Sequence, residues 1–211
     1  KPILGDAKVS LQLLKALSTN YKVSSGYISK YTAAKERWLK DLEKITAPSL
    51  MNSLPSDSQV IGAVNRSVPE NTIVIGAAGS MPGELHKLWK VLDQNTYHME
   101  YGYSCMGYEI SAGIGVNLAT PNRPNVVFSG DGSYLMMNSE LATAAMMGIS
   151  MTLILTNNKG YGCINRLQKA TGGAEFNNLF SDSKFDKQIE IDFVSHAKSM
   201  GAKAVYVSEI A

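Results

Sequence analysis

From Asn71 onward, short apolar runs alternate with longer amphipathic runs, and this alternation constrains the fold more than any other feature of the sequence. The short runs are rich in branched and aromatic residues, as buried strands are. Strands that alternate with helices favour a parallel sheet covered by helices. We therefore predict an α/β fold, a doubly wound and mostly parallel sheet with helices on both faces. The predicted strands are 72–75, 96–100, 126–129, 151–156 and 203–207. The predicted helices lie near 82–92, 106–119, 138–147, 162–170 and 191–200.

The part of the chain before Asn71 has the pattern of helices and connectors. Leucines at helix-like spacing occur in 1–20, and the charged, alanine-rich run 27–46 is typical of an exposed helix. Polar or proline-containing stretches at 21–26 and 47–57 are typical of connectors. One further helix is predicted to run to about Ser67, with Asp57 or Ser58 as its cap.

These patterns predict three parts. We expect residues 1–20 to end a preceding central domain, 21–57 to be a linker with an exposed helix, and 58–211 to be one α/β domain that is truncated at its C-terminus. The chain begins at Lys1 without a methionine and stops just after a strand-like run. We therefore expect it to be a piece of a longer polypeptide.

Composition argues against two classes of partner. Hydrophobic residues make up 45% of the chain and charged residues 18%, which suits a globular protein with a core. A net charge of +2 gives no basis for a nucleic-acid-binding surface. No apolar run in the sequence approaches the roughly 18 residues that a membrane span needs. Cys105 and Cys163 have neither zinc-site nor disulfide-framework spacing, so we expect buried, reduced thiols in the cytoplasm.

Two polar motifs follow two of the predicted strands. Gly130-Asp131-Gly132-Ser133 comes directly after 126–129, and Asn157-Asn158 comes directly after 151–156. Parallel strands end at the same edge of a sheet, where open α/β sheets bind ligands. Asp131 and Asn158, 27 positions apart, are therefore expected to approach one another and could share a Mg²⁺ ion. The alternative is that both motifs are ordinary turns, with the asparagines as turn and cap residues.

The two motifs at this interval resemble the diphosphate-and-magnesium motif of thiamin-diphosphate enzymes. The resemblance implies thiamin diphosphate and Mg²⁺ as cofactors. It implies three protein ligands for the metal, with diphosphate oxygens and water completing an octahedron. These ligands are the side chains of Asp131 and Asn158 and the backbone carbonyl of Gly160. The cofactor site would also include Gly130, Gly132, Tyr161 and Gly162.

Two more segments are candidates for holding the diphosphate. Gly79 and Ser80 follow the strand 72–75, where backbone amides and a hydroxyl can bind a terminal phosphate. A simple turn of small residues is the alternative at this place. Ser133 could point at the diphosphate from the start of its helix, or cap that helix, or do both.

Met106 is the candidate for the residue that shapes the bound cofactor. It lies 25 positions before Asp131, where the family has an apolar side chain that forces the two cofactor rings into a V. Backbone groups near Ser104 and Met106 would then bind the aminopyrimidine ring. A long, apolar and adaptable side chain suits this role. The alternative is a core methionine at the start of a helix.

The catalytic group cannot be assigned within this sequence. In the family, a glutamate that promotes ylid formation belongs to a separate pyrimidine-binding domain, usually contributed across a dimer interface. Neither Glu100 nor Glu109 is assigned that role, and we expect the chain alone to be inactive, with a homodimer or homotetramer as the complete enzyme. His98 is a candidate acid–base group because histidine titrates near neutral pH, although a structural hydrogen bond is the alternative.

The resemblance narrows to one subgroup, the hydrolases that open the ring of a cyclic dione in myo-inositol breakdown. It is carried by 77–86, by the tyrosine-rich run 95–109 and by 161–165. Residues 171–190 are harder to align, so no substrate role is assigned there. Two alternatives stay open: the same domain of an acetohydroxyacid synthase or 2-oxoacid decarboxylase, and a non-catalytic binding module. A dinucleotide-binding domain is disfavoured because no Gly-x-Gly-x-x-Gly opens the first strand–helix unit.

Overall fold

The computed structural model describes residues 2, 4–48 and 54–210. The chain divides into two compact units, Lys1–Lys44 and Ile45–Ala211. The three-part division expected from the sequence, at 20 and 57, remains a prediction about the domains.

The first unit is helical. Helix α1, Ala7–Leu17, begins after Asp6, whose side chain accepts a hydrogen bond from the Val9 N–H at 2.9 Å. This is the cap expected of an aspartate before a helix. Helix α2, Ser25–Thr46, begins in this unit and confirms the helix predicted at 27–46. None of the α1 side chains is buried within the described structure.

The second unit opens with helix α3, Asp57–Ser67. Its cap is Ser56, so both predicted caps, Asp57 and Ser58, are wrong by one and two residues. The Ser56 hydroxyl accepts from the Gln59 N–H and the Gln59 side chain accepts from the Ser56 N–H, which is a capping box. Residues 49–53 of the predicted connector 47–57 lie outside the described residues.

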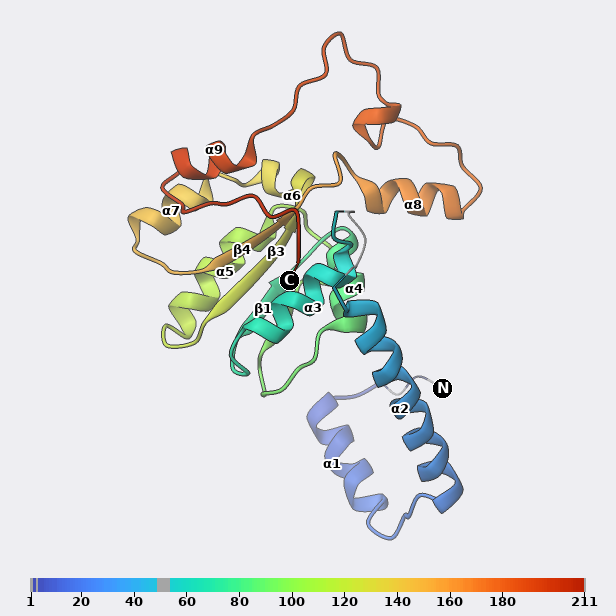
Figure 1. The fold of residues 1–211 in the computed structure, drawn as a ribbon. Coiled ribbons are helices and arrows are strands. Elements are labelled where there is room, and N and C mark those ends of the chain that lie inside the picture. The colour runs from blue at the N-terminus through green and yellow to red at the C-terminus, as the bar shows by residue number, and fades with distance from the viewer. Residues whose placement is uncertain (1, 3, 49–53, 211) are drawn as a thin grey trace. The chain divides into compact units, whose positions relative to one another are not determined.

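The centre of the second unit is a parallel sheet with the strand order β2-β1-β3-β4 (Figure 1). Four predicted strands are thereby confirmed, with no end shifted by more than one residue. The register pairs Val74 with Tyr97, Ile75 with Val127, and Phe128 with Ile154. The strands are β1 Ile73–Gly76, β2 Tyr97–Met99, β3 Asn125–Gly130 and β4 Thr152–Thr156.

The strand predicted at 203–207 is wrong. Residues 202–210 form neither helix nor strand, and Val205, Tyr206 and Val207 are exposed. Branched and aromatic residues favour a strand only where a neighbouring strand and a buried face are available. Within the described residues, nothing pairs with this segment.

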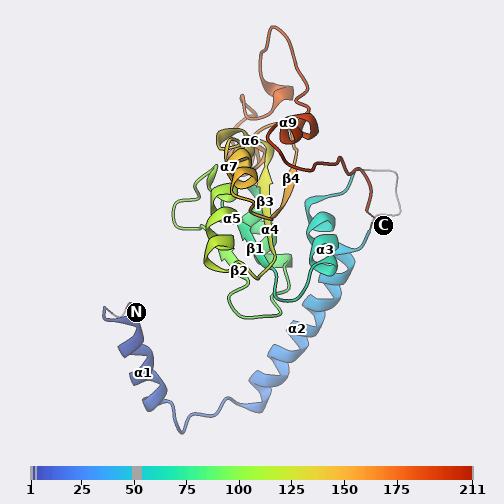
Figure 2. The ribbon, with the colours of Figure 1, turned by 90° about the vertical axis from the view of Figure 1, so that its left-hand side faces the viewer.

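Helices cover both faces of the sheet, as predicted. Figures 1 and 2 show α5, α7 and α9 on one side and α3 and α4 on the other. On the α5 side, Ile75 and Val127 pack against Ala112. On the α4 side, Trp89 packs edge-on against Phe128, with ring centroids 6.1 Å apart. The helices after α3 are α4 Ser80–Leu88, α5 Tyr108–Ala119, α6 Asp131–Met136, α7 Glu140–Met146, α8 Gly162–Ala170 and α9 Phe193–Ser199. A short 3₁₀ turn spans Phe180–Asp182.

Three predicted helices have different boundaries in the structure. The helix predicted from Met106 begins at Tyr108, because Gly107 has a left-handed backbone with φ of 85° and cannot belong to it. The helix predicted at 138–147 is α7, and a separate helix, α6, begins directly at Asp131. Helix α4 ends at Leu88, before the predicted end at Leu92.

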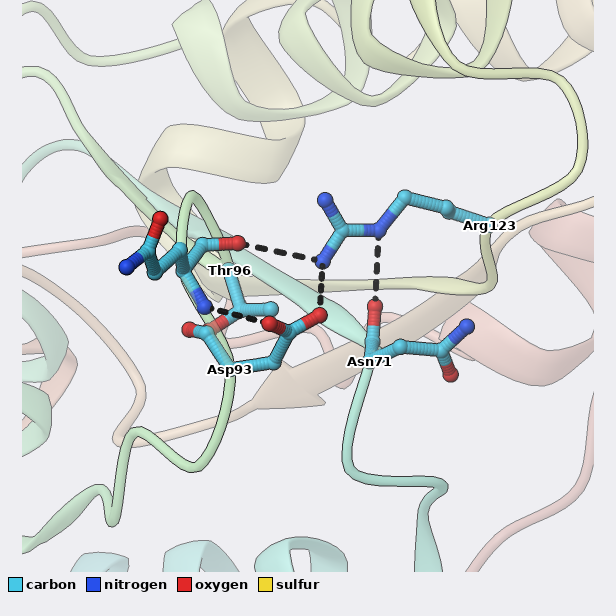
Figure 3. Close-up of polar contacts among 5 residues, drawn as sticks. Asn71, Asp93, Thr96 and Arg123 are labelled. Carbon is cyan, nitrogen blue, oxygen red and sulfur yellow. Dashed lines mark hydrogen bonds and ion pairs between the residues drawn. The ribbon is translucent and has the colours of Figure 1, made fainter.

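One arginine ties together the loops at the amino edge of the sheet (Figure 3). Arg123 lies before β3. Its guanidinium donates to the Asn71 carbonyl before β1 at 3.1 Å, and to the Gln94 carbonyl and Asp93 carboxylate before β2, both at 3.4 Å. These contacts all lie at the amino edge of the sheet, and other residues line its carboxyl edge.

None of the helices in the described part of the chain is both long and apolar enough to span a membrane.

Candidate functional site

A cavity of about 210 Å³ lies at the carboxyl edge of the sheet, lined by the segments that follow all four strands. The chain reverses its direction of winding between β1 and β3, since β2 lies outside β1 while β4 lies outside β3. Ligands of open parallel sheets bind at such a switch point. The fold therefore places the cavity where its topology favours a ligand.

All twelve residues predicted to bind the cofactor line this cavity. They come from the segments at the ends of β1, β2, β3 and β4, up to 83 positions apart in the chain. Their roles in binding remain predictions, but their gathering at one place is what those roles require. The residues are Gly79, Ser80, Ser104, Met106, Gly130, Asp131, Gly132, Ser133, Asn158, Gly160, Tyr161 and Gly162.

Asp131 is the buried acid of the cavity. It is the first residue of α6, directly after β3, and only 4% of its surface is exposed. Its Oδ2 accepts a hydrogen bond from the Gly160 N–H at 2.9 Å, which brings the β3 and β4 loops together. Its Oδ1 is buried and has no hydrogen-bond partner among the described residues. Such an oxygen is expensive to bury and is available to a ligand.

The electrostatics of Asp131 follow from this burial. Burial raises the pKa of its carboxyl above the usual range, although the backbone N–H groups of Gly160, Asn158 and Gly132 act in the opposite direction. The ionised carboxylate is thus disfavoured by its surroundings as they stand. A cation on Oδ1 would supply the missing counter-charge.

Asn158 lies where this cavity meets a second one. The second cavity, of about 490 Å³, is lined by residues of the β4 loop and of 179–193, and Asp131 and Asn158 line both cavities. Gly162 makes room for the Asn158 side chain, because a Cβ at Gly162 would lie 2.9 Å from the Asn158 Nδ2. The described residues hold no group of three His, Cys, Asp or Glu side chains that could bind a metal. A cation here would depend on one carboxylate with amide and carbonyl oxygens, which suits Mg²⁺ better than a transition metal.

Gly132 is held between two side chains of the cavity. A Cβ at this position would lie 2.6 Å from the Tyr161 ring and 3.5 Å from the Met106 methyl group. Glycine is therefore required here by close approach rather than by backbone conformation. The contact also shows that Met106, the predicted wedge, faces the Gly-Asp-Gly-Ser motif.

Gly79 and Ser80 form the start of α4 at another wall of the cavity. Gly79 has a positive φ of 85°, and a Cβ on it would meet no atom within 4 Å, so its backbone borders open space. The Ser80 hydroxyl accepts a hydrogen bond at 2.6 Å from the Arg166 guanidinium of α8. Sequence reasoning missed Arg166, which lies 86 positions from Ser80 and belongs to no motif.

Ser133 has a different side-chain partner from the predicted one. Its hydroxyl lies 2.7 Å from both carboxylate oxygens of Glu109, to which it donates. Its single hydrogen is therefore used within the protein, and only the Ser133 backbone is left to face a diphosphate. Sequence reasoning also missed Glu109 as part of this site. The one available signal was an acid in the first turn of an otherwise apolar helix.

Glu100 shapes the loop that leads to Met106. Its carboxylate accepts hydrogen bonds from the backbone N–H groups of Tyr103 at 2.8 Å and Cys105 at 2.7 Å, and these bonds lower its pKa. Ser104, between them, adopts a left-handed backbone with φ of 52°. The side chain of Cys105 is exposed and that of Cys163 is partly buried, so the prediction of two buried thiols is wrong; both cysteines are free.

His98 does not line either cavity in the described structure. Its Nε2 lies 2.8 Å from the Tyr108 hydroxyl, and the two rings stack at 16°. This is the structural hydrogen bond that the sequence left open as the alternative. A catalytic role for His98 remains a prediction.

Comparison with known proteins agrees with this geometry. Residues 77–211 match the model of the family described as thiamine pyrophosphate enzyme, C-terminal TPP binding domain. A 4-hydroxybenzoylformate decarboxylase of Rhodococcus jostii RHA1, a thiamine diphosphate-dependent enzyme, has a similar fold, with a TM-score of 0.67. The similarity covers 78% of this chain and 30% of that one, at 23% sequence identity.

Curated relatives have closer sequences. A protein of Clostridium tetani is 38% identical over 99% of this chain, and one of Geobacillus thermodenitrificans is 35% identical over 97%. Both are named 3D-(3,5/4)-trihydroxycyclohexane-1,2-dione hydrolase. The chain spans 37% and 36% of their lengths. Because residues 77–211 match this family model, the chain belongs to the thiamine pyrophosphate enzymes and contains their C-terminal TPP-binding domain.

Proposed function

We propose that this chain is the cofactor-binding part of a hydrolase that opens the ring of 3D-(3,5/4)-trihydroxycyclohexane-1,2-dione to 5-deoxy-D-glucuronate, in myo-inositol breakdown. The observation that carries the proposal is the shared name of the relatives that are 34–38% identical over nearly the whole chain. Family membership supports the cofactor, and the relatives' names support the substrate.

The polar groups of the cavity support the proposal that thiamin diphosphate binds through a magnesium ion. Asp131 Oδ1 is a buried acceptor with no hydrogen-bond partner among the described residues. The Asn158 side chain and the Gly160 backbone lie in the loop beside it. We propose these three groups as the protein ligands of Mg²⁺, with phosphate oxygens and water completing the shell. The open backbone at Gly79 and Gly130, where a Cβ would meet no atom within 4 Å, leaves room for the diphosphate.

The chemistry supplied by bound thiamin diphosphate is that of an electron sink for cleavage of a C–C bond beside a carbonyl. The residues of this chain position the reacting parts. Met106, facing Gly132, would support the bent cofactor, and the Gly79–Ser80 segment would hold the terminal phosphate at the start of α4. The Tyr161 ring lies against Gly132 and would form part of the wall around the bound cofactor.

The complete enzyme is proposed to need more than this chain. Because the relatives are longer, we propose that a pyrimidine-binding domain with the catalytic glutamate lies in the remaining length. We further propose a cytoplasmic homodimer or homotetramer, since in this family the glutamate usually reaches the cofactor from a partner subunit.

The test is a substrate comparison with the complete polypeptide that carries this chain. The protein, loaded with thiamin diphosphate and Mg²⁺, is incubated with the cyclic dione or with pyruvate, and products are identified by mass spectrometry. We expect a product with the mass of the dione plus one water, and no turnover of pyruvate. Turnover of pyruvate alone would instead support a synthase or decarboxylase. Turnover of neither, without cofactor binding, would support a non-catalytic binding module.

A further inference from the structure

Glu109 is a fully buried acid that connects three segments lining the cavity. It lies in the first turn of α5, and only 1% of its surface is exposed. Its Oε1 accepts a hydrogen bond from the Ala78 N–H of the β1 loop at 3.3 Å, and its Oε2 accepts one from the Gly107 N–H at 3.1 Å. Both oxygens lie 2.7 Å from the Ser133 hydroxyl of the β3 loop.

Hydrogen bonds alone compensate this buried carboxylate. Among the described residues, no lysine, arginine or histidine forms an ion pair with Glu109. A buried carboxylate without such bonds would be strongly destabilising. The Ser133 Oγ also accepts from the Gly107 N–H at 2.8 Å, so Gly107, Glu109 and Ser133 form a closed triangle of contacts. The partners in the other loops are 24 and 31 positions away, so this contact network fixes distant segments rather than one local turn.

The network also fixes two peptide planes beside the cavity. Because a peptide group is planar and trans, the direction of the Gly107 N–H sets the direction of the Met106 carbonyl. In the same way, the Ala78 N–H sets the direction of the Ala77 carbonyl. Met106 and Ala78 both line the cavity, whereas Glu109 does not. Glu109 therefore contacts residues of the cavity wall without lining the cavity itself.

We propose that Glu109 is a positioning residue for the cofactor. Its carboxylate holds the Met106–Gly107 peptide, the Ser133 hydroxyl and the loop after β1 in the arrangement that receives the cofactor. This inference rests on the proposed function, because it takes thiamin diphosphate as the ligand of the cavity. It assigns Glu109 no contact with the substrate and no proton transfer.

The test uses Glu109→Gln in the complete polypeptide. Glutamine keeps the size of the side chain but turns an NH₂ donor toward groups that are themselves donors. We expect the dissociation constant for thiamin diphosphate at saturating Mg²⁺ to rise about 10- to 100-fold, as for other partners that orient a binding group. The kcat at saturating cofactor should fall, while the KM for the dione stays within about threefold, because Glu109 makes no substrate contact.

The matched control is Arg123→Ala. Arg123 also ties three loops together, but at the opposite edge of the sheet (Figure 3). Its removal should lower the melting temperature and leave both the cofactor dissociation constant and kcat within about twofold. A purely structural Glu109 would give the same pattern as Arg123→Ala.

Ser133→Ala is the second variant if Glu109→Gln does not fold, because it removes only one hydroxyl from the triangle. It should weaken cofactor binding about tenfold. Where Glu109→Gln does fold, adding Ser133→Ala to it should weaken binding little further, since both act through one network. If the wild-type protein binds the cofactor and these variants match it in affinity and kcat, the positioning role is overturned while the proposed function stands. If the wild-type protein does not bind thiamin diphosphate, the proposed function falls, and the positioning role falls with it.

Discussion

At the scale of single residues, Tyr97 shows what burial does to a polar group outside the cavity. Its hydroxyl is buried without a hydrogen-bond partner among the described residues. Burial, with a smaller contribution from Tyr101, raises the pKa of Tyr97 to about 12. The neutral form is favoured in the folded state, so the contribution of this pKa shift to the free energy of unfolding is fully present below pH 10. That contribution is lost as the pH rises from about 10 to about 12.

We therefore predict that Tyr97→Phe is neutral or stabilising. Removing an unpaired buried hydroxyl should raise the free energy of unfolding by up to about 1 kcal/mol at pH 7. The variant should also lose less stability than the wild type between pH 10 and pH 12. Urea unfolding at pH 7 and pH 11 measures both effects, and a Tyr97→Phe protein that is clearly less stable than the wild type at pH 7 would contradict the prediction.

The sequence predicts single residues well where a motif names them. Asp131, Asn158 and Met106 all line one cavity, as predicted. Each could be found because its place after a predicted strand can be read from the neighbouring sequence. Glu109 and Arg166 could not be predicted, since their partners lie 24 to 86 positions away and are found only through packing. The same holds for Ser133, whose hydroxyl bonds to Glu109 although the sequence left it free to point at a ligand.

At the scale of elements, helix α5 contains two glycines with opposite surroundings. A Cβ on Gly113 would lie 2.7 Å from the Val127 Cγ2 and 2.8 Å from the Met151 Sδ, so this glycine lets the helix approach the sheet. A Cβ on Gly115 would meet no atom within 4 Å, and Gly115 is exposed. The first glycine is needed for packing and the second only weakens the helix.

This contrast predicts opposite effects for the same substitution. Gly115→Ala should raise the free energy of unfolding by about 0.5–1 kcal/mol, because alanine favours the helix and restricts the unfolded chain. Gly113→Ala should lower it by about 1–3 kcal/mol through overpacking against β3. Urea denaturation of the two variants measures both signs. A stable Gly113→Ala together with an unstable Gly115→Ala would mean that α5 packs on the sheet through another face.

The elements that the sequence predicted correctly are those with a strong period and a partner. The predicted ends lie within about two residues of the observed ones for strands β1, β3 and β4 and for helix α8. Each of these elements has a clear apolar pattern with turn residues at its ends. The segment 203–207 has an equally strong strand pattern and forms no strand, because pairing depends on a neighbour rather than on the segment itself. The start of α5 depended on the left-handed Gly107, which the apolar pattern does not reveal.

At the scale of the whole molecule, the candidate cofactor site lies within one of the two compact units of the chain. The cavity, its buried acid and the loops that position them all lie in Ile45–Ala211. The chain spans 36–37% of the length of its relatives. We therefore predict that a purified fragment of residues 1–211, shown to be folded by circular dichroism, does not turn over the dione. Measurable turnover by this fragment would show that the catalytic group is within it.

We propose that Asp131 and the β4 loop bind the cofactor through a metal ion. Titration calorimetry of the complete polypeptide with thiamin diphosphate tests it most directly, in Mg²⁺ or in EDTA, for the wild type, Asp131→Ala and the control Gly115→Ala. Asp131→Ala should still fold, because burial raises the pKa of this carboxyl and its charge does not stabilise the protein on its own. We predict Mg²⁺-dependent binding by the wild type and by Gly115→Ala, with affinity at least about 100-fold weaker in EDTA or in Asp131→Ala, a loss of about 2.7 kcal/mol. Equal affinity with and without Mg²⁺, or an Asp131→Ala protein that binds like the wild type, would rule out binding through a metal ion at Asp131.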